Sequence, residues 1–159
     1  MHKRYLILTL LIIAMATSIH AETGVDWAEV TSNAPWAERN YHTSVVHDGR
    51  IWLMGGHDGD STLNDVWSTR DGEHWVCVTE HAPWVPRYAH ASLVHGGRIW
   101  IIGGRTDGPT YFSDVWSSAD GVAWELAHGS AAFGARGNLA ASTYNNRMFL
   151  TGGYTGGES

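Results

Sequence analysis

The stretch NDVWSTRDGEHW, residues 64–75, returns 49 residues later as SDVWSSADGVAW, residues 113–124. The matching positions hold an acid, a Trp, an Asp-Gly pair and a second Trp: Asp65 and Asp114, Trp67 and Trp116, Asp71-Gly72 and Asp120-Gly121, Trp75 and Trp124. Such a motif is either a ligand site or a piece of scaffold. The sequence on either side of it distinguishes the two interpretations, because it repeats at the same interval.

The repeat extends well beyond this motif. WAERNYHTSVVHDGRIWLMGG (36–56) aligns with WVPRYAHASLVHGGRIWIIGG (84–104) and, more weakly, with FGARGNLAASTYNNRMFLTGG (133–153). Each copy ends in a double glycine: Gly55-Gly56, Gly103-Gly104 and Gly152-Gly153. All 9 Trp residues fall on positions of the repeat. A Trp that binds a ligand is expected to break such a pattern, so we assign the Trp residues to the scaffold.

Each copy begins with two predicted strands joined by a tight turn. HTSVVH (42–47) and RIWLMGG (50–56) flank Asp48-Gly49, which favours a type I′ turn because both turn residues need positive φ. Gly96-Gly97 and Asn145-Asn146 stand at the same place in the other copies and tolerate the same geometry.

The quoted motif supplies the third and fourth predicted strands. DVWST (65–69) and HWVCVT (74–79) are rich in Val, Thr and Trp and are joined by the Asp71-Gly72 turn. No long helical periodicity is present. Four-stranded units of 48–49 residues predict an all-β fold built from the blades of a β-propeller.

The pattern IWLMGG…DVWSTRDGEHW, repeated as IWIIGG…DVWSSADGVAW, resembles kelch repeats. The resemblance covers nearly all of residues 22–159 and implies a kelch-type propeller similar to the central domain of galactose oxidase. Trp67 and Trp116 depart from it, since many kelch repeats carry Tyr there. STRDGEHW also resembles the Asp-box of sialidase-type propellers, in which one residue separates the acid from the Gly.

The first 21 residues have the layout of a secretory signal peptide. Lys3 and Arg4 precede an apolar run that ends near Ala16, and a short polar end reaches Ala21. The run is shorter than the ~20 apolar residues of a membrane span, and no later segment resembles one. We therefore expect residues 1–21 to be removed and the protein to be secreted or periplasmic. An uncleaved anchor is the alternative.

The remaining residues, 22–159, are predicted to form one incomplete propeller domain. Its repeats run over approximately 33–80, 81–129 and, in part, 130–159. Residues 23–36 align with 71–84 and add a lone fourth strand, of the kind that completes the last blade in kelch propellers. We expect one lone strand, two blades and half of a third. Missing blades of the same chain, or self-association, would then close the ring.

Charge and cysteine content limit the classes of partner. Loss of Lys3 and Arg4 with the signal peptide, and of no acid, takes the formal net charge from −6 to −8. This acidity argues against nucleic acid as a partner. Cys77 is the only cysteine, so no internal disulfide is expected, and its surroundings indicate a strand residue.

Polar residues that differ between the copies lie in the predicted loops. If the four strands of a blade alternate in direction, the short turns share one face and the longer loops share the other. The loops that follow the double glycines differ most, and loops on a rigid scaffold often carry function. The binding candidates are His57, Asp58, Asp60, Arg105, Asp107 and Tyr111. An ordinary solvated loop is the alternative for each.

No metal, cofactor or catalytic group is predicted. Asp58, Asp60 and Asp65 suggest calcium, but the terminal Glu and the spacing of a calcium loop are missing. No nucleophile elbow or phosphate-binding loop is present. The copper site of galactose oxidase-like enzymes implies a Cys cross-linked to Tyr, and Cys77, on the outermost predicted strand, does not suit it.

Two further sets of repeated residues have structural interpretations. His42 and His90, like His47 and His95, stand on successive first strands, which favours packing or hydrogen bonds between blades over metal binding. Arg39, Arg87 and Arg136 are predicted to tie loop carbonyls or the repeated Asp residues between blades, because a guanidinium offers five donors in a rigid plane.

The function expected from these features is non-catalytic binding of a protein or a glycan. The alternative is the N-terminal piece of a carbohydrate-active propeller enzyme, of the oxidase or mutarotase type, whose catalytic residues lie in missing blades. A remnant without independent function is a third hypothesis. The fold alone does not choose among them.

Overall fold

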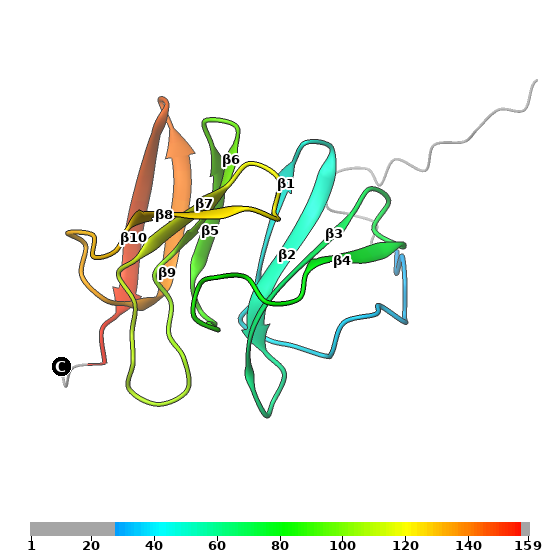
Figure 1. The fold of residues 1–159 in the computed structure, drawn as a ribbon, viewed down its shortest axis with the longest axis horizontal. Helices are drawn as coiled ribbons and strands as arrows, with labels where there is room; N and C mark the ends of the chain where they lie inside the picture. The colour runs from blue at the N-terminus through cyan, green and yellow to red at the C-terminus, as the bar shows by residue number, and fades with distance from the viewer. Residues whose placement is uncertain (1–27, 157–159) are drawn as a thin grey trace, which may run out of the picture.

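The computed structural model describes residues 28–156 of the 159-residue chain. The predicted signal peptide, residues 1–21, and Trp27 lie outside the described residues. All regular secondary structure between residues 28 and 156 is β-strand, so that segment contains no helix able to cross a membrane. Figure 1 shows three antiparallel units arranged side by side in chain order.

Two of these units are four-stranded sheets whose strands follow one another in chain order. Blade 1 contains β1 (Thr43–His47), β2 (Arg50–His57), β3 (Thr62–Thr69) and β4 (Trp75–Thr79). Blade 2 contains β5 (Ala91–His95), β6 (Arg98–Ile102), β7 (Val115–Ser118) and β8 (Trp124–His128). Half-blade 3 contains β9 (Gly137–Tyr144) and β10 (Arg147–Tyr154). The all-β, blade-like prediction is confirmed.

The predicted tight turns between the first two strands of each unit are also confirmed. Asp48 and Gly49 have φ of 48° and 64°, and Asn145 and Asn146 have φ of 47° and 54°. Gly96-Gly97 likewise has both φ positive. Three different dipeptides therefore adopt one backbone geometry, because Gly, Asn and Asp tolerate the left-handed region better than other residues.

The lone fourth strand expected over residues 23–36 is not a strand in its described part. Residues 28–39 carry no strand assignment, and a single isolated bridge joins Asn40 to His57. An isolated strand leaves its backbone N–H and C=O groups unpaired. It therefore needs a neighbouring third strand, and none lies beside residues 28–39 in the described part of the chain.

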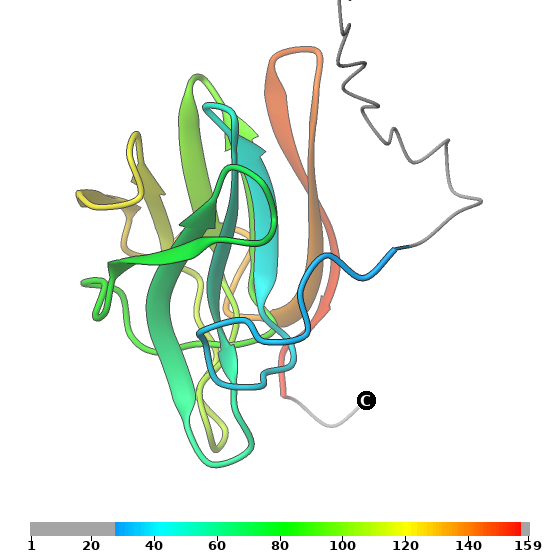
Figure 2. The ribbon, with the colours of Figure 1, turned by 90° about the vertical axis from the view of Figure 1, so that its right-hand side faces the viewer.

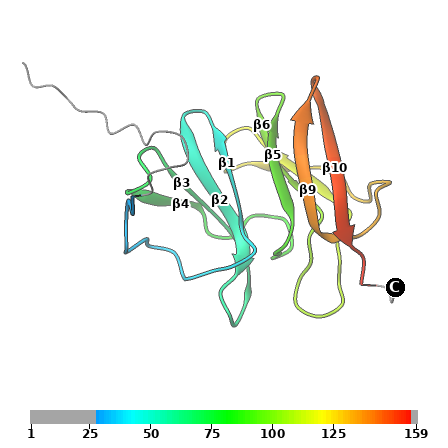
Figure 3. The ribbon, with the colours of Figure 1, turned by 180° about the vertical axis from the view of Figure 1, so that it is seen from behind.

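The units pack face to face through apolar side chains. The first strand of blade 2, β5, contacts β1 on one side and β9 on the other, which places these three strands innermost (Figures 1 and 3). Figure 2 looks along the row of units from the side of blade 1. One apolar cluster joins blades 1 and 2, with Trp52, Trp84 and Trp124 among its buried members. A second joins blade 2 to half-blade 3 through Leu93 and Leu139.

The indole N–H groups make the same hydrogen bonds in both blades. Trp67 Nε1 donates to Asp65 Oδ2 at 2.7 Å, and Trp116 Nε1 donates to Asp114 Oδ2 at 2.8 Å. Two further repeated pairs donate to main-chain carbonyls: Trp52 to His47, Trp100 to His95, Trp75 to Gly72 and Trp124 to Gly121. Equivalent bonds at equivalent positions are what a repeated scaffold requires.

The acids of the repeated motif are likewise engaged within the fold. Asp71 Oδ1 accepts the N–H groups of Glu73 and His74, and Asp120 Oδ1 accepts those of Val122 and Ala123. Each carboxylate thus caps the tight turn between the third and fourth strands. The N–H groups of residues 122 and 123 are the main reason that the pKa of Asp120 lies below its usual value.

Arg39 and Arg87 bind the other repeated acid. Arg87 Nη1 and Nη2 donate to Asp114 Oδ1 and Oδ2 at 2.6 and 2.9 Å, and Nη1 also donates to the Gly103 carbonyl at 2.9 Å. Arg39 makes the same three bonds to Asp65 and the Gly55 carbonyl. The predicted ties to loop carbonyls and repeated Asp residues are therefore present in blades 1 and 2.

Candidate functional site

The long loops emerge together at one end of the row of blades. In Figure 1 the loops after β2 and β6 lie at the lower end, while the β1–β2, β5–β6 and β9–β10 turns lie at the upper end. The view from behind agrees (Figure 3). We call the lower end the loop face and the upper end the turn face. All six predicted binding candidates belong to loop-face segments.

Two of the candidates connect the loops of neighbouring blades. His57 Nε2, at the end of β2, lies 3.1 Å from Asp107 Oδ1 in the loop between β6 and β7. Thr62 Oγ1, at the start of β3, donates to Asp107 Oδ2 at 2.7 Å. One carboxylate of blade 2 therefore bridges both sides of the blade 1 loop and holds the two loops together.

Arg105 and Tyr111 form the second contact among the candidates. Arg105 Nη1 donates to the Tyr111 hydroxyl at 3.1 Å, and Nη2 donates to the Gly108 carbonyl at 3.0 Å. The guanidinium carbon lies 5.1 Å from the centre of the Tyr111 ring and 5.2 Å from that of Tyr88. The cation therefore lies close to two aromatic rings, a favourable arrangement for Arg.

The two remaining candidates are set apart from these contacts. Asp58 Oδ1 accepts the N–H groups of Asp60 and Ser61 at 3.0 and 2.7 Å, which closes the tip of the β2–β3 loop. The same N–H groups, Ser61 first, lower the pKa of Asp58. Asp60 is exposed at this tip. The Asp58 carboxylate therefore shapes its own loop.

Three tyrosines that the sequence analysis did not select complete the arrangement. Tyr88 lies 5.7 Å from Tyr41 and 5.5 Å from His57 between ring centres, and Tyr154 lies 5.9 Å from Tyr111. Together with four of the six candidates they form a continuous row across the loop face, which we call the aromatic strip: Tyr41, His57, Tyr88, Arg105, Asp107, Tyr111 and Tyr154.

The aromatic strip follows repeat positions at which the copies differ. The residue after each double glycine is His57, Arg105 or Tyr154. Its pairing partner is Asn40 or Tyr88, just before the first strand of the unit, or Gly137, the first residue of β9. Tyr88 and Tyr154 could have been selected from the sequence, because both occupy repeat positions at or near the ends of strands, where the three copies carry different residues. The proximity of Tyr154 to Tyr111 could not be foreseen, because it depends on how the loops fold.

A polar cavity of about 290 Å³ opens beside the strip. It is lined by Glu38, Arg39, Asn40, His57, Asp58 and Gly59. His57 belongs to both the cavity and the strip, so the aromatic rings and the polar groups form one continuous surface. The volume is at the small end of the range for ligand sites, roughly 300–1,000 Å³.

Two of the repeated histidines, His47 and His90, make contacts between the blades. His90 Nε2 forms a 2.7 Å hydrogen bond with Thr43 Oγ1 of blade 1, and His47 Nε2 donates to the Ala119 carbonyl of blade 2 at 3.0 Å. Burial, followed by the charges near Arg87 and His42, lowers the pKa of His90 to about 3. His90 is therefore neutral at physiological pH, as the packing interpretation requires.

The calcium hypothesis finds no support between residues 28 and 156, where no three His, Cys, Asp or Glu side chains converge in a metal-binding group. Asp65, its third proposed ligand, has both carboxylate oxygens bound by Arg39. Cys77 lies on β4, and burial is the main cause that raises the pKa of its thiol. Both residues belong to the blade scaffold.

The blades, their innermost strands and the shared loop face define this molecule as a β-propeller protein. Its family is narrower: the chain belongs to the DUF6242 beta propeller domain family, which matches it over residues 8–159. A search of curated proteins finds no match to the chain.

Proposed function

We propose that this protein is a non-catalytic carbohydrate-binding module built on kelch-type blades, with the aromatic strip and the adjoining polar cavity as its binding surface. The observation that carries the proposal is the continuity of the two. Tyr41 and Tyr88 lead to His57, and His57 forms part of the cavity wall.

Sugar rings present two kinds of surface, and the loop face offers a partner for each. Their C–H faces are apolar and stack on aromatic rings, whereas their hydroxyl groups need hydrogen-bond donors and acceptors with fixed positions. Tyr41 is 60% exposed and Tyr154 is 52% exposed, so their rings are accessible to a ligand. Glu38, Asn40 and Asp58 supply polar groups in the cavity.

The polar members of the strip hold one another in place. Asp107 is fixed by His57 and Thr62, and Arg105 is fixed by Tyr111 and the Gly108 carbonyl. Groups positioned in this way can bind a ligand with little loss of side-chain entropy. Such preorganisation favours binding as the activity of this surface.

The test is a glycan array probed with the full chain and two variants. We expect Tyr88→Ala to weaken binding to the recognised glycans by tenfold or more, about the loss expected for removal of a central aromatic contact. Tyr144→Ala is the matched control. Tyr144 is 67% exposed and lies at the end of β9 that faces the turn face, away from the aromatic strip. It should bind as the wild type does.

Two results would reject the proposal. One is the absence of binding to every glycan on the array by the wild-type chain. The other is equal binding by wild type and Tyr88→Ala, which would place the glycan elsewhere. Specific binding of a purified protein that Tyr88→Ala abolishes would assign the strip to a protein partner instead.

We further propose that additional strands cover the outer edge of β10 and close the ring, supplied by further blades or by a second copy of the chain. Phe149 is 44% exposed and Met148 is 37% exposed on this strand, and both are large apolar residues. An apolar cavity of about 280 Å³ lies between half-blade 3 and blade 2, lined in part by Trp100, Phe133 and Met148. Apolar surface of this kind favours a partner.

A further inference from the structure

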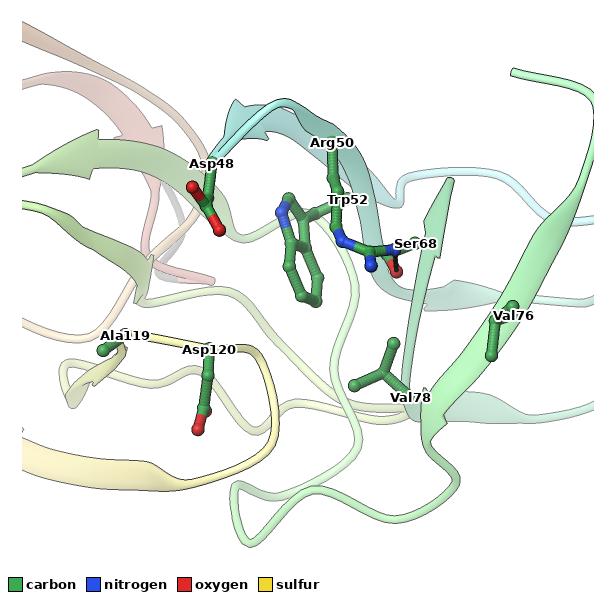
Figure 4. A pocket seen from close by; sticks show the side chains of 8 residues that line it. All are labelled: Asp48, Arg50, Trp52, Ser68, Val76, Val78, Ala119 and Asp120. Atoms are coloured by element: carbon green, nitrogen blue, oxygen red, sulfur yellow. Dashed lines mark hydrogen bonds between the residues drawn. The ribbon is translucent and has the colours of Figure 1, made fainter. Parts of the chain in front are cut away.

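A second cavity, of about 410 Å³, lies on the turn face between blades 1 and 2. It is bounded by the first turn and three strands of blade 1 and by the β7–β8 turn of blade 2. The lining residues are Asp48, Arg50, Trp52, Ser68, Val76, Val78, Ala119 and Asp120 (Figure 4). None of them belongs to the aromatic strip, so this cavity is separate from the carbohydrate site proposed above.

Arg50 has fewer partners than the equivalent arginine of blade 2. Arg98 donates to Ser117 Oγ at 3.0 Å, to the Ser117 carbonyl at 3.4 Å and to Glu125 Oε2 at 2.9 Å. Arg50 makes one long bond, 3.4 Å, to Ser68 Oγ. Within the described residues no carboxylate oxygen lies within 4 Å of its guanidinium nitrogens.

The cause of this difference is a single substitution between the repeats. Val76 occupies in β4 the position that Glu125 occupies in β8, since Val76 pairs with Ser68 as Glu125 pairs with Ser117. Blade 2 therefore neutralises its arginine internally, whereas blade 1 leaves donors of Arg50 free to face the cavity. A partly buried guanidinium with free donors is a binding group for a carboxylate.

The opposite side of the cavity is acidic. Figure 4 shows Asp48 and Asp120 on the side of the Trp52 ring away from Arg50. Oδ1 of Asp120 is bound by main-chain N–H groups, and Oδ2 has no hydrogen-bond donor within the described residues. Two carboxylates against one guanidinium disfavour a simple anion, because the acids repel it. A ligand with charges of both signs satisfies both sides.

The space between the charged groups is bounded by apolar side chains. Val76 and Val78 project from β4, and the Trp52 indole lies between Arg50 and the two acids (Figure 4). An aliphatic body would be removed from water against these residues, which is favourable by about 25 cal/mol per Å² of apolar surface buried. An ammonium group near the indole would gain a cation–π contact as well.

We propose that this cavity binds a small aliphatic zwitterion of the amino-acid class. Its carboxylate pairs with Arg50, its ammonium group faces Asp48 and Asp120, and its aliphatic body packs against Val76, Val78 and Trp52. The site is specific to the gap between blades 1 and 2, because it depends on the replacement of Glu125 by Val76.

Three chemically matched probes test the proposal by isothermal titration calorimetry on the full chain. 6-Aminohexanoate carries one charge at each end of an aliphatic chain, 6-acetamidohexanoate keeps only the carboxylate, and 6-aminohexanamide keeps only the cation. We expect 6-aminohexanoate to bind at least tenfold more tightly than either analogue, since loss of one charge-assisted contact costs roughly that factor. Equal affinities for the three probes, or no heat from 6-aminohexanoate at millimolar concentration, would overturn the proposal.

Two variants and a control locate the site. Arg50→Gln removes the guanidinium, and Val76→Glu supplies the internal partner that Arg98 already has; Val76 is 59% exposed, so the longer side chain can be accommodated. Each should weaken 6-aminohexanoate binding tenfold or more. Arg98→Gln should leave it unchanged. Unchanged binding by folded Val76→Glu, or equal losses in Arg50→Gln and Arg98→Gln, would contradict the assignment.

Binding at this cavity should be independent of binding at the carbohydrate site. Tyr88→Ala, which tests the aromatic strip, should bind 6-aminohexanoate as the wild type does. Val76→Glu should retain glycan binding. Loss of both activities in either variant would indicate a general defect of folding and would remove the support for two separate sites.

Discussion

Arg87 binds Asp114 through its two terminal guanidinium nitrogens, Nη1 and Nη2, at 2.6 and 2.9 Å, and its side chain is completely buried. Its main chain meanwhile belongs to blade 1, where Arg87 N donates to the Leu63 carbonyl and the Arg87 carbonyl accepts the N–H of Gly56. One residue therefore joins the backbone of blade 1 to a side chain of blade 2. Burial alone would raise the pKa of Asp114. The hydrogen bonds and the charge of Arg87 outweigh this effect, so the pKa of Asp114 is lowered.

Arg87→Lys should destabilise the protein by about 2 kcal/mol or more in urea unfolding. A lysine keeps the charge but cannot donate in parallel to both oxygens of Asp114, and a buried pair that loses its geometry is costly. Arg70→Lys is the control, because Arg70 is exposed; it should change stability by less than about 0.5 kcal/mol. Equal stability of the two variants would show that the paired geometry is not required.

Gly121→Ala should destabilise the contact between blades 1 and 2 by about 3 kcal/mol. A Cβ at this position would overlap the Trp52 ring, and the φ of Gly121 is +73°. Gly97→Ala is the matched control, with a φ of +70° and no atom within 4 Å of the added Cβ. It should lose only the backbone contribution, about 1 kcal/mol. Thermal unfolding of both variants measures the difference, and similar losses would reject a steric role for Gly121.

The stability of the protein should fall as the pH drops below about 6.5. The pKa of His90 is 6.5 when unfolded and about 3 when folded, so the unfolded state takes up the proton first. At pH 5 this favours unfolding by about 2 kcal/mol relative to pH 7, where His90 is neutral in both states.

His90→Leu tests this origin of the pH dependence. Leu139 occupies the equivalent position in half-blade 3 and is buried, so the substitution suits the fold. The difference between the free energies of unfolding at pH 7 and pH 5 should shrink by about 2 kcal/mol in the variant. An unchanged difference would assign the pH dependence to other groups, such as His42, whose pKa is also lowered by burial.

Export should be accompanied by cleavage after Ala21. The polar end of the predicted signal peptide stops there, so N-terminal sequencing of the protein recovered outside the cytoplasm should begin at Glu22. Replacing Leu8 and Leu11 with Arg should keep the chain in the cytoplasm at its full length, because the apolar run would be interrupted. A chain recovered outside the cytoplasm with Met1 intact would instead support the uncleaved anchor.

The repeat made the blades predictable, whereas the site was predictable only in part. His57, Arg105, Asp107 and Tyr111 could be selected because they break the repeat, and all four lie in the aromatic strip. Asp58 could not be separated from them, since its hydrogen bonds to its own loop leave no trace in the alignment. Tyr88 was missed because it precedes a strand and lies outside the variable loops.

By itself the sequence determined the strands, the I′ turns and the scaffold role of the repeated Trp and Asp residues. These features depend on local periodicity and backbone preference, which a repeated pattern displays directly. Only the tertiary structure decided that Tyr88 stacks on Arg105 of the adjacent β-bridge and that Arg50 faces a cavity beside Asp120. Such contacts depend on how neighbouring loops and blades pack. They join residues far apart in the chain, as the bond from the His47 side chain to the Ala119 carbonyl, 72 residues away, illustrates.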